Sequence, residues 1–263
     1  MRPPQDDGSN VCSCRMTIAA LALLAFTVLV SSFISGIFGM AGGMILLGVL
    51  LAYFDVASAM ILFSLIQIFA NGWRALQWRH YVRWPIIFSY AIGAAIAFTG
   101  LYAVKFVPDK MMVYLSLGMM PFAIEALPRE LRPNIEWRGV PFVTGVLTTV
   151  IQVLAGVGGL FLDIFFQKSM LDRKTTNATK AIVQTLSHVI RASYFGTLSG
   201  LAGVPKWTLA PSIALALAAT SLAPFVIERM TDHGYRQWTR AIIFAVSSVY
   251  LVRGGLLWWH AAP

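Results

Sequence analysis

Two glycine-interrupted stretches, Ser35-Gly36-Ile37-Phe38-Gly39-Met40-Ala41-Gly42-Gly43 and Gln152-Val153-Leu154-Ala155-Gly156-Val157-Gly158-Gly159, decide the fold of this chain. Polar residues follow both stretches at nearly the same distance. Gln67, Asn71 and Arg74 begin 24 residues after the first stretch, and Gln184, His188 and Arg191 begin 25 residues after the second. A broken apolar segment that occurs twice, each time before polar residues deep in apolar sequence, is typical of duplicated membrane proteins that hold a substrate between their halves.

The composition indicates a membrane protein. Of the 263 residues, 58% are hydrophobic and 12% are charged, whereas soluble domains carry about 25% charged residues. Charge-free windows cover 16–54, 56–73, 84–104, 139–162 and 207–227. Several reach the roughly 20 residues that a helix needs to cross a bilayer. We therefore expect an all-α polytopic membrane protein, whose net charge of +9 reflects basic loops rather than binding to nucleic acid.

The apolar segments divide the chain into two halves. A polar tail at 1–15 contains Cys12 and Cys14, to which we assign no function. The first repeat, 16–127, has segments at 16–38, 42–54, 56–79, 85–104 and 110–127. A cytoplasmic connector at 128–138 precedes the second repeat, 139–263, with segments at 139–155, 158–168, 175–200, 207–227 and 236–258. The first apolar stretch is far longer than a signal-peptide core and is expected to be part of the folded protein.

Loop charge predicts that the two repeats are inverted. If each glycine-broken unit either returns to the side from which it entered or crosses twice, the basic loops divide unequally between the two faces of the membrane. Twelve basic residues then fall on one face and six on the other: Arg74, Arg79, Arg83, Arg129, Arg132, Arg138, Lys168, Arg173, Lys174, Arg229, Arg236 and Arg240 against Arg2, Arg15, Lys105, Lys110, Lys206 and Arg253. The positive-inside rule favours this arrangement, with both termini outside. The short segments 42–54 and 158–168 are then re-entrant, followed in each half by three transmembrane helices.

The glycine clusters are candidates for anion binding. Gly42, Gly43, Gly158 and Gly159 allow backbone N–H groups to approach a ligand closely, and successive N–H groups at a helix start attract an anion. The alternative is close helix packing, for which small residues are common in membrane proteins.

The polar residues of the second half share one helical face, because Lys180, Gln184, His188 and Arg191 are spaced by three or four positions. Gln67, Asn71 and Arg74 repeat this spacing in the first half, with Phe63 in the position of the lysine. A cationic stripe inside a membrane indicates a cavity or a partner. The alternative, in which the arginines reach lipid head groups, suits Arg74 better than Arg191.

Asp163 is the carboxylate within the second short segment. It is a candidate for proton coupling, because burial in a low dielectric favours its protonated form. The alternative is an ion pair with Lys180 or Arg191. His188 is either a group that titrates near neutral pH or a hydrogen-bonded residue of a helix contact.

The segments SGIFGMAGG and LAGVGGL, the two polar helices and the hydrophilic connector resemble those of the sulfite exporter TauE/SafE family of bacterial membrane permeases. The resemblance covers nearly the whole chain after residue 15. It implies transport of small sulfur-containing anions, such as sulfite and organosulfonates, across the inner membrane. The chain departs from the usual pattern at Met44 and Leu160, where a further glycine is common, and Asp163 lies in an arm where a proline is expected.

These observations predict a secondary transporter for a small anion in the bacterial inner membrane, not an enzyme, and with no cofactor or metal. Its partners are the anion, the lipid bilayer and a coupling proton or sodium ion. The glycines Gly42, Gly43, Gly158 and Gly159 would offer amides, and Gln67, Asn71, Gln184 and His188 would offer hydrogen bonds. Lys180 or Arg191 would supply charge. The alternatives are a membrane-embedded enzyme acting on lipid or isoprenoid phosphates, and a channel-like subunit.

Overall fold

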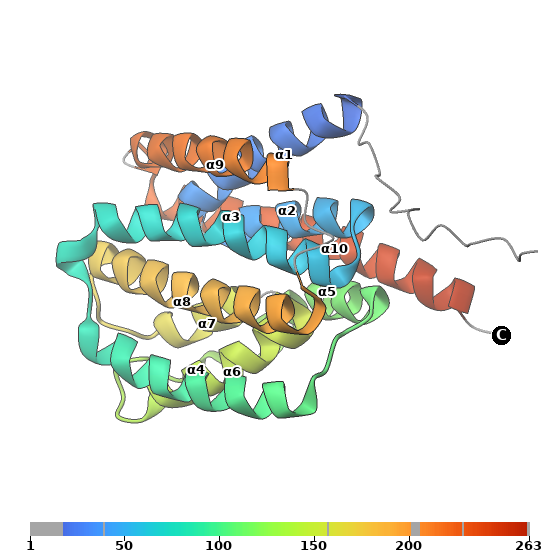
Figure 1. Cartoon of the computed structure of the whole chain (residues 1–263). Helices are drawn as coiled ribbons and strands as arrows, with labels where there is room; N and C mark the ends of the chain where they lie inside the picture. The colour runs from blue at the N-terminus through green and yellow to red at the C-terminus, as the bar shows by residue number, and fades with distance from the viewer. Residues whose placement is uncertain (1–17, 39, 157, 201–205, 228, 262–263) are drawn as a thin grey trace, which may run out of the picture.

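The computed structural model describes residues 18–38, 40–156, 158–200, 206–227 and 229–261. Within these residues the chain is helical and contains no strand (Figure 1). The first half comprises α1 (Ile18–Phe38), α2 (Met40–Tyr53), α3 (Val56–Gln77), η1 (Arg79–Tyr81), α4 (Trp84–Val104) and α5 (Lys110–Ala126). The second comprises η2 (Arg129–Leu131), α6 (Val140–Ala155), α7 (Gly158–Phe166), α8 (Arg173–Ser199), α9 (Lys206–Ile227) and α10 (Asp232–Ala261). The expected all-α membrane class is confirmed.

Five of the described helices are long and apolar enough to cross a membrane. The candidate spans are Leu21–Phe38, Val56–Gln77, Trp84–Val104, Trp207–Val226 and Gln237–His260. The apolar helices at Ala41–Tyr53 and Val140–Ala155 are shorter. Helix α8 has 27 residues but carries several polar and basic side chains, so that hydropathy alone does not identify it as a span.

Aspartate residues cap α3 and α8 at their first turns. The Asp55 carboxylate accepts a hydrogen bond of 3.0 Å from the backbone N–H of Ser58, and Asp172 accepts two from Lys174 and Thr175, of 3.1 and 3.3 Å. Such caps satisfy N–H groups that have no partner inside the helix. The two aspartates are 117 positions apart, as are Gln67 and Gln184, Asn71 and His188, and Arg74 and Arg191. The starts of α3 and α8 therefore share the 117-residue offset of the polar positions.

Helices α3 and α8 lie against each other at the centre of the molecule and run in opposite directions (Figure 1). Near the end of α3, Arg74 contacts Gln184 of α8. Ten residues earlier on α3, Ser64 contacts Arg191, which lies seven residues later on α8. Lys174, at the start of α8, lies over the ring of Trp78, just beyond the end of α3. The polar stripes of the two halves consequently face one another.

The outer helices pack across the halves. Helix α4 lies against α6 of the second half, and α9 lies against α1 of the first. Gly93 and Gly145 allow the first of these contacts, since a Cβ atom at Gly93 would overlap the carbonyl oxygen of Phe142 and one at Gly145 would overlap that of Tyr90. Each half therefore buries part of its helix surface against the other half.

Each glycine break lets a short helix fold back on the one before it. Gly42 of α2 lies so close to α1 that a Cβ atom would overlap the backbone of Ser31 and Ser35. In the second half, the N–H of Ile135, which precedes α6, donates to the carbonyl of Phe165 near the end of α7, at 2.8 Å. Helices α6 and α7 therefore form a hairpin that opens at the connector.

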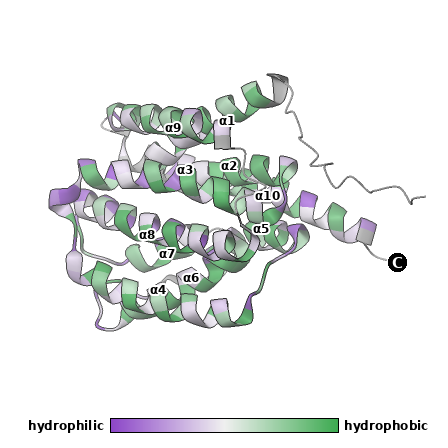
Figure 2. Cartoon of the chain, viewed as in Figure 1, coloured by the Kyte–Doolittle hydropathy of each residue, from purple (hydrophilic) through white to green (hydrophobic). Residues whose placement is uncertain are grey.

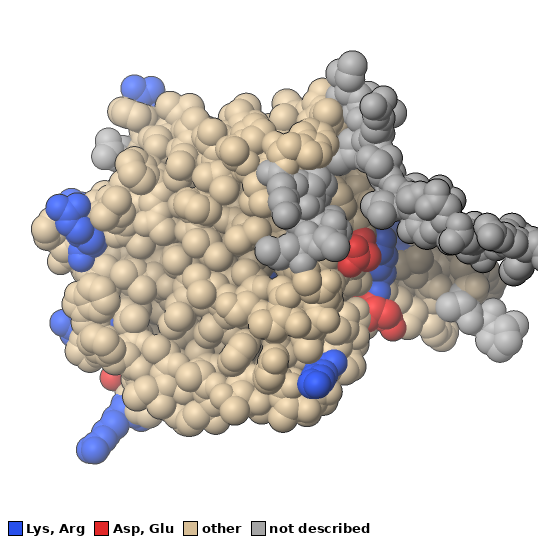
Figure 3. Space-filling view, viewed as in Figure 1, with Lys and Arg blue, Asp and Glu red and all other residues tan. Residues whose placement is uncertain are grey.

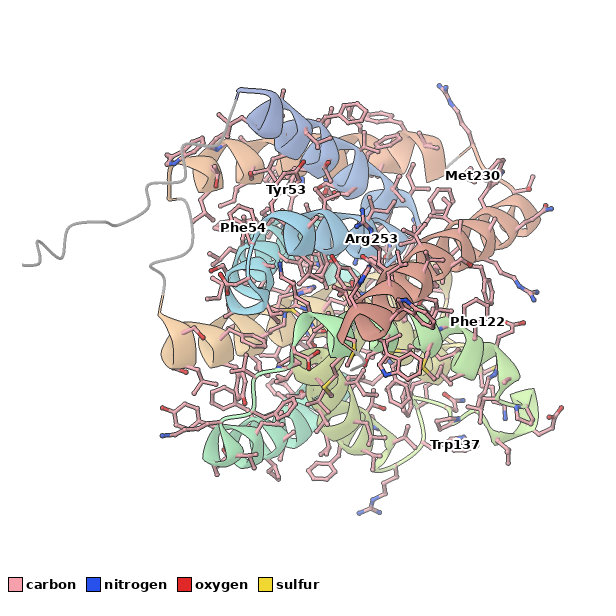
Figure 4. All side chains as sticks on the ribbon, turned by 90° about the vertical axis from the view of Figure 1, so that its right-hand side faces the viewer. Tyr53, Phe54, Phe122, Trp137, Met230 and Arg253 are labelled. Carbon is pink, nitrogen blue, oxygen red and sulfur yellow. The ribbon has the colours of Figure 1, made fainter. Side chains whose placement is uncertain are left out.

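Charged and hydrophobic residues lie in different parts of the molecule. Hydrophobic residues cover the outer helices, and a hydrophilic region lies where α3 ends (Figure 2). Lys and Arg gather mainly at the left edge of the face shown in Figure 3, whose middle is largely uncharged. Large apolar side chains such as Phe122 and Trp137 are exposed on the outer surface of the protein (Figure 4). An apolar outer surface of this kind suits contact with lipid.

Candidate functional site

Arg74 lies inside the contact between α3 and α8. Its Nη2 atom donates to Asn71 Oδ1 at 2.7 Å and to Gln184 Oε1 at 2.6 Å, and Nη1 donates to the carbonyl of Ser35 at 3.4 Å. The residue is 6% exposed. The expectation that Arg74 reaches lipid head groups is therefore wrong. The two arginines that follow it, Arg79 and Arg83, lie beyond the end of α3 and are exposed.

Arg191 is completely buried, at 0% exposure. Its Nε atom donates to Ser64 Oγ of α3 at 2.7 Å, Nη1 donates to the carbonyl oxygen of Gly156, and Nη2 donates to His188 Nδ1 at 3.0 Å. The guanidinium carbon lies 4.5 Å from the centre of the Phe63 ring. These hydrogen-bond acceptors are all uncharged. A buried cation held only by neutral groups keeps much of its desolvation cost, which an anion would offset.

The second glycine break supplies backbone groups to this cluster. Gly156 ends α6 with φ of +78°, a conformation that side chains with a Cβ rarely adopt, and its carbonyl oxygen accepts from Arg191. The N–H of Gly158 donates to Gln152 Oε1, and Gln152 Nε2 lies 3.3 Å from His188 Nδ1. In this structure the Gly158 amide is therefore bonded to a side chain. Gly159, the next residue, is also buried.

The first glycine break is packed against the polar face of α3. A Cβ atom at Gly43 would lie 2.9 Å from Gln67 Nε2, so the missing side chain brings this backbone next to the amide. The amide of Asn71 donates to the carbonyl of Gln67 at 3.0 Å. Gly42 serves the close packing of α2 on α1, which matches the alternative interpretation of its cluster.

Lys180 and Asp163 form an ion pair between α8 and α7, and both side chains are partly buried. Of the two interpretations of Asp163, the paired one describes this structure. Lys180 lies on the same helical face as Gln184, but its charge is compensated by a carboxylate, unlike that of Arg191.

Three residues in or beside the site were not among the sequence candidates: Ser64, Gln152 and Tyr90. Ser64 binds Arg191, and Gln152 links Gly158 to His188. The Tyr90 hydroxyl lies 2.7 Å from both Thr148 Oγ1 and Ser187 Oγ, which ties α4 to α6 and α8. A signal for Gln152 was present, since it and Ser35 are 117 positions apart and each stands four residues before a glycine of its break.

Among the described residues, no three of His, Cys, Asp and Glu lie together in a way that could hold a metal ion. Cys12 and Cys14 lie outside the described part of the chain.

The comparison with known families agrees with this architecture. The family model for the sulfite exporter TauE/SafE family matches residues 23–251, which includes both glycine breaks and both polar helices. No curated protein and no solved structure matches the chain. Since the match spans most of the chain and the helices are those of a multi-pass membrane protein, the chain belongs to the sulfite exporter TauE/SafE family and is a membrane transporter.

Proposed function

We propose that this protein is a secondary transporter of a small sulfur-containing anion, such as sulfite or an organosulfonate, and that the anion binds between α3 and α8. The observation that carries the proposal is the environment of Arg191, which is fully buried and hydrogen-bonded to neutral groups. Cations inside a membrane protein mark ion pathways and substrate sites, because their burial is costly without a counter-charge.

The donor groups around Arg191 suit an oxyanion. Arg74 reaches the same interface from α3, and the amides of Gln67, Asn71 and Gln184 lie along it. Guanidinium groups bind planar and tetrahedral oxyanions through paired N–H donors. Gly42, Gly43, Gly158 and Gly159 remain proposed contributors of backbone amides once the anion displaces contacts such as the one from Gly158 to Gln152.

An inverted arrangement of the repeats is supported by the direction of their central helices. Helices α3 and α8, which correspond in sequence, run in opposite directions. The α6–α7 hairpin opens at the connector end, whereas α2 leads to the start of α3 at the other end (Figure 1). We propose that both hairpins are re-entrant and that they enter the membrane from opposite sides.

Alternating access requires that contacts between the halves change. The hydrogen bonds from Arg74 to Gln184 and from Arg191 to Ser64 join α3 to α8 within the site. An anion that competes for these donors would weaken the contact between the repeats, and a rocking movement of one half against the other would then expose the site. In the proposed orientation the connector and the other basic loops face the cytoplasm, and the protein lies in the bacterial inner membrane.

The test is flux of labelled anions into proteoliposomes containing the purified protein. We expect saturable flux for at least one of sulfite, methanesulfonate and taurine, and a large loss of that flux in Arg191→Gln. Arg138→Gln, at an exposed position of the connector, is the control and should transport normally. If no small oxyanion shows saturable flux, the proposal is wrong. Lipid-phosphate turnover by the same protein would favour the enzyme alternative instead.

A further inference from the structure

The two buried arginines are held in matching ways that differ in one group. Arg74 Nη2 donates to Asn71 Oδ1 at 2.7 Å, and Arg191 Nη2 donates to His188 Nδ1 at 3.0 Å. In both cases the acceptor lies three residues earlier on the same helix. An amide oxygen does not titrate near neutral pH, whereas an imidazole does. Only the second of these contacts therefore responds to protons.

His188 is neutral in this structure, with Nδ1 unprotonated. Arginine N–H groups can only donate, so Nδ1 must accept from Arg191. The amide orientation of Gln152 is fixed by its Oε1 atom, which accepts from the N–H of Gly158. Its Nε2 atom consequently faces Nδ1, at 3.3 Å, as a second donor. The ring hydrogen of His188 is thereby assigned to Nε2.

We propose that His188 Nδ1 is the proton-binding site that couples proton movement to anion transport, an inference that rests on the proposed function. When a proton binds, an N–H bond forms at Nδ1 and the hydrogen bonds from Arg191 and Gln152 to that atom are lost. The imidazolium then donates from both nitrogens, and Arg191 has a free N–H. Both groups can donate to one bound anion, so the proton and the anion enter the site together and cross together.

The surrounding groups favour this linked binding. Arg191 contacts His188 directly, and Arg74 of α3 reaches the same interface through Gln184, one turn before His188 on α8. Tyr90 of α4 has its hydroxyl bonded to Ser187, next to His188, and α6 carries no charged residue. On α7, Asp163 is paired with Lys180 of α8. The uncompensated charges that share this interface with His188 are therefore positive, and a bound anion would offset the cost of adding another.

The Asp163–Lys180 pair has a separate consequence. A carboxylate already neutralised by an ammonium group is a poor proton carrier, because protonation would leave the lysine uncompensated. The charge of a protonated His188 would instead be balanced by the transported anion. His188 is therefore the better candidate for the proton carrier. Proton coupling is thus assigned to α8 rather than to α7.

The experiment measures anion and proton fluxes together in proteoliposomes that contain a trapped pH-sensitive dye. Methanesulfonate is the probe, since its own charge does not change between about pH 5 and 8, where histidine titrates. We expect wild-type flux to carry one proton per anion, and the dissociation constant to fall by up to about tenfold per unit decrease in pH. If methanesulfonate is not carried, isethionate, whose sulfonate group is also fully ionised in this range, serves for the flux ratio.

His188→Asn is the decisive variant, because it gives the second half the acceptor that Asn71 provides in the first. Its residual anion flux should carry no proton, and its dissociation constant, raised toward the wild-type value at high pH, should no longer depend on pH. His80→Asn, at an exposed position of η1, should retain both properties. Asp163→Asn should retain the one-to-one flux ratio.

Anion flux without proton flux in the wild-type protein would overturn the inference and leave the proposed function intact. So would an unchanged flux ratio in His188→Asn, or loss of proton flux in Asp163→Asn alone. If His188→Asn does not fold, as judged by size-exclusion chromatography, the wild-type flux ratio and pH dependence decide the matter. Absence of any anion flux or binding in the wild-type protein would instead contradict the proposed function.

Discussion

At the scale of single residues, the site depends on two guanidinium groups that α3 and α8 bury against each other. Each one binds an acceptor on its own helix and another on the partner helix, so that Arg74 reaches Gln184 and Arg191 reaches Ser64. Arginine keeps its charge when buried and offers donors in a fixed planar fork. The site therefore keeps both its charge and its orientation inside an apolar protein.

Replacing either arginine should weaken anion binding. We expect Arg191→Gln and Arg74→Gln each to raise the dissociation constant at least about tenfold, since a charge-assisted hydrogen bond contributes about 1.5–3 kcal/mol. Isothermal titration with sulfite and methanesulfonate measures this directly, with Arg138→Gln as the control. The sequence favoured Arg191 over Arg74 as the source of charge, because the lipid-head-group alternative suited Arg74 better. The burial of Arg74 now predicts effects of similar size, and an unchanged affinity in Arg74→Gln would contradict it.

The sequence predicted which polar residues of α8 share one helical face, but not which residues of other helices they contact. Helical spacing places Gln184, His188 and Arg191 on one face, because that depends only on 3.6 residues per turn. The pairing of Arg191 with Ser64 depends on how far α3 and α8 slide along each other. That register is set by packing between helices far apart in the chain, which spacing within one helix cannot reveal.

At the scale of helices, close approach and capping position the site. Helices α4 and α6 touch at Gly93 and Gly145, and α3 and α8 begin at Asp55 and Asp172. Partial burial opposes ionisation of Asp55, but hydrogen bonds from Ser58 outweigh it and lower the pKa of the carboxyl. The hydrogen bond from Thr175 lowers the pKa of Asp172 in the same way.

Adding a methyl group at Gly93 should separate α4 from α6. A Cβ atom there would overlap the carbonyl of Phe142, whereas one at Gly100 of the same helix meets nothing within 4 Å. We expect Gly93→Ala to lose about 1–3 kcal/mol of stability. Gly100→Ala should unfold at or slightly above the wild-type temperature, because alanine favours helix. Thermal unfolding in detergent distinguishes the two, and equal melting temperatures would refute the close contact.

Removing the Asp55 cap should destabilise α3 in a pH-dependent way. We expect Asp55→Ala to cost about 1 kcal/mol near neutral pH. The pKa of Asp55 is lower in the folded protein than its usual 3.8, so the stabilisation from its charge is present above that pH and is lost as the pH falls below it. Asp55→Asn, which keeps an acceptor, should lose less at neutral pH. A stability difference between the wild-type protein and Asp55→Ala that stays constant as the pH falls below 3.8 would contradict the role of the charge.

At the scale of the whole molecule, the two halves are interlocked. Helix α4 lies on α6 and α9 lies on α1, while α3 and α8 form the central contact. The connector, which precedes α6, lies against the segment after α7, where the Asn134 amide donates to the carbonyl of Lys168 at 3.1 Å and the Met170 N–H donates to Glu136 at 2.7 Å. The basic segments around the connector and the start of α8 are thus gathered at one end of the protein.

Cysteine labelling tests which way this end faces. In a variant without Cys12 and Cys14, we expect Met170→Cys to react with a membrane-impermeant maleimide only after the inner membrane is opened. Lys105→Cys, between α4 and α5, should react in intact spheroplasts. Both positions are exposed. The opposite pattern would reverse the proposed orientation, and reaction of both in intact spheroplasts would refute the expected number of crossings.

The sequence by itself determined the membrane class, the approximate bounds of the ten α-helices in the described residues, and the two glycine breaks with the polar positions that follow each. These follow from local properties: apolar length, helical spacing and the positions of glycine, which act over a few turns of chain. Only the tertiary structure decided that Arg74 is buried and that Asp163 pairs with Lys180. It also decided that His188 accepts a hydrogen bond from Arg191. Those facts depend on the register and direction of helices from opposite halves, which are set by close packing across the whole molecule.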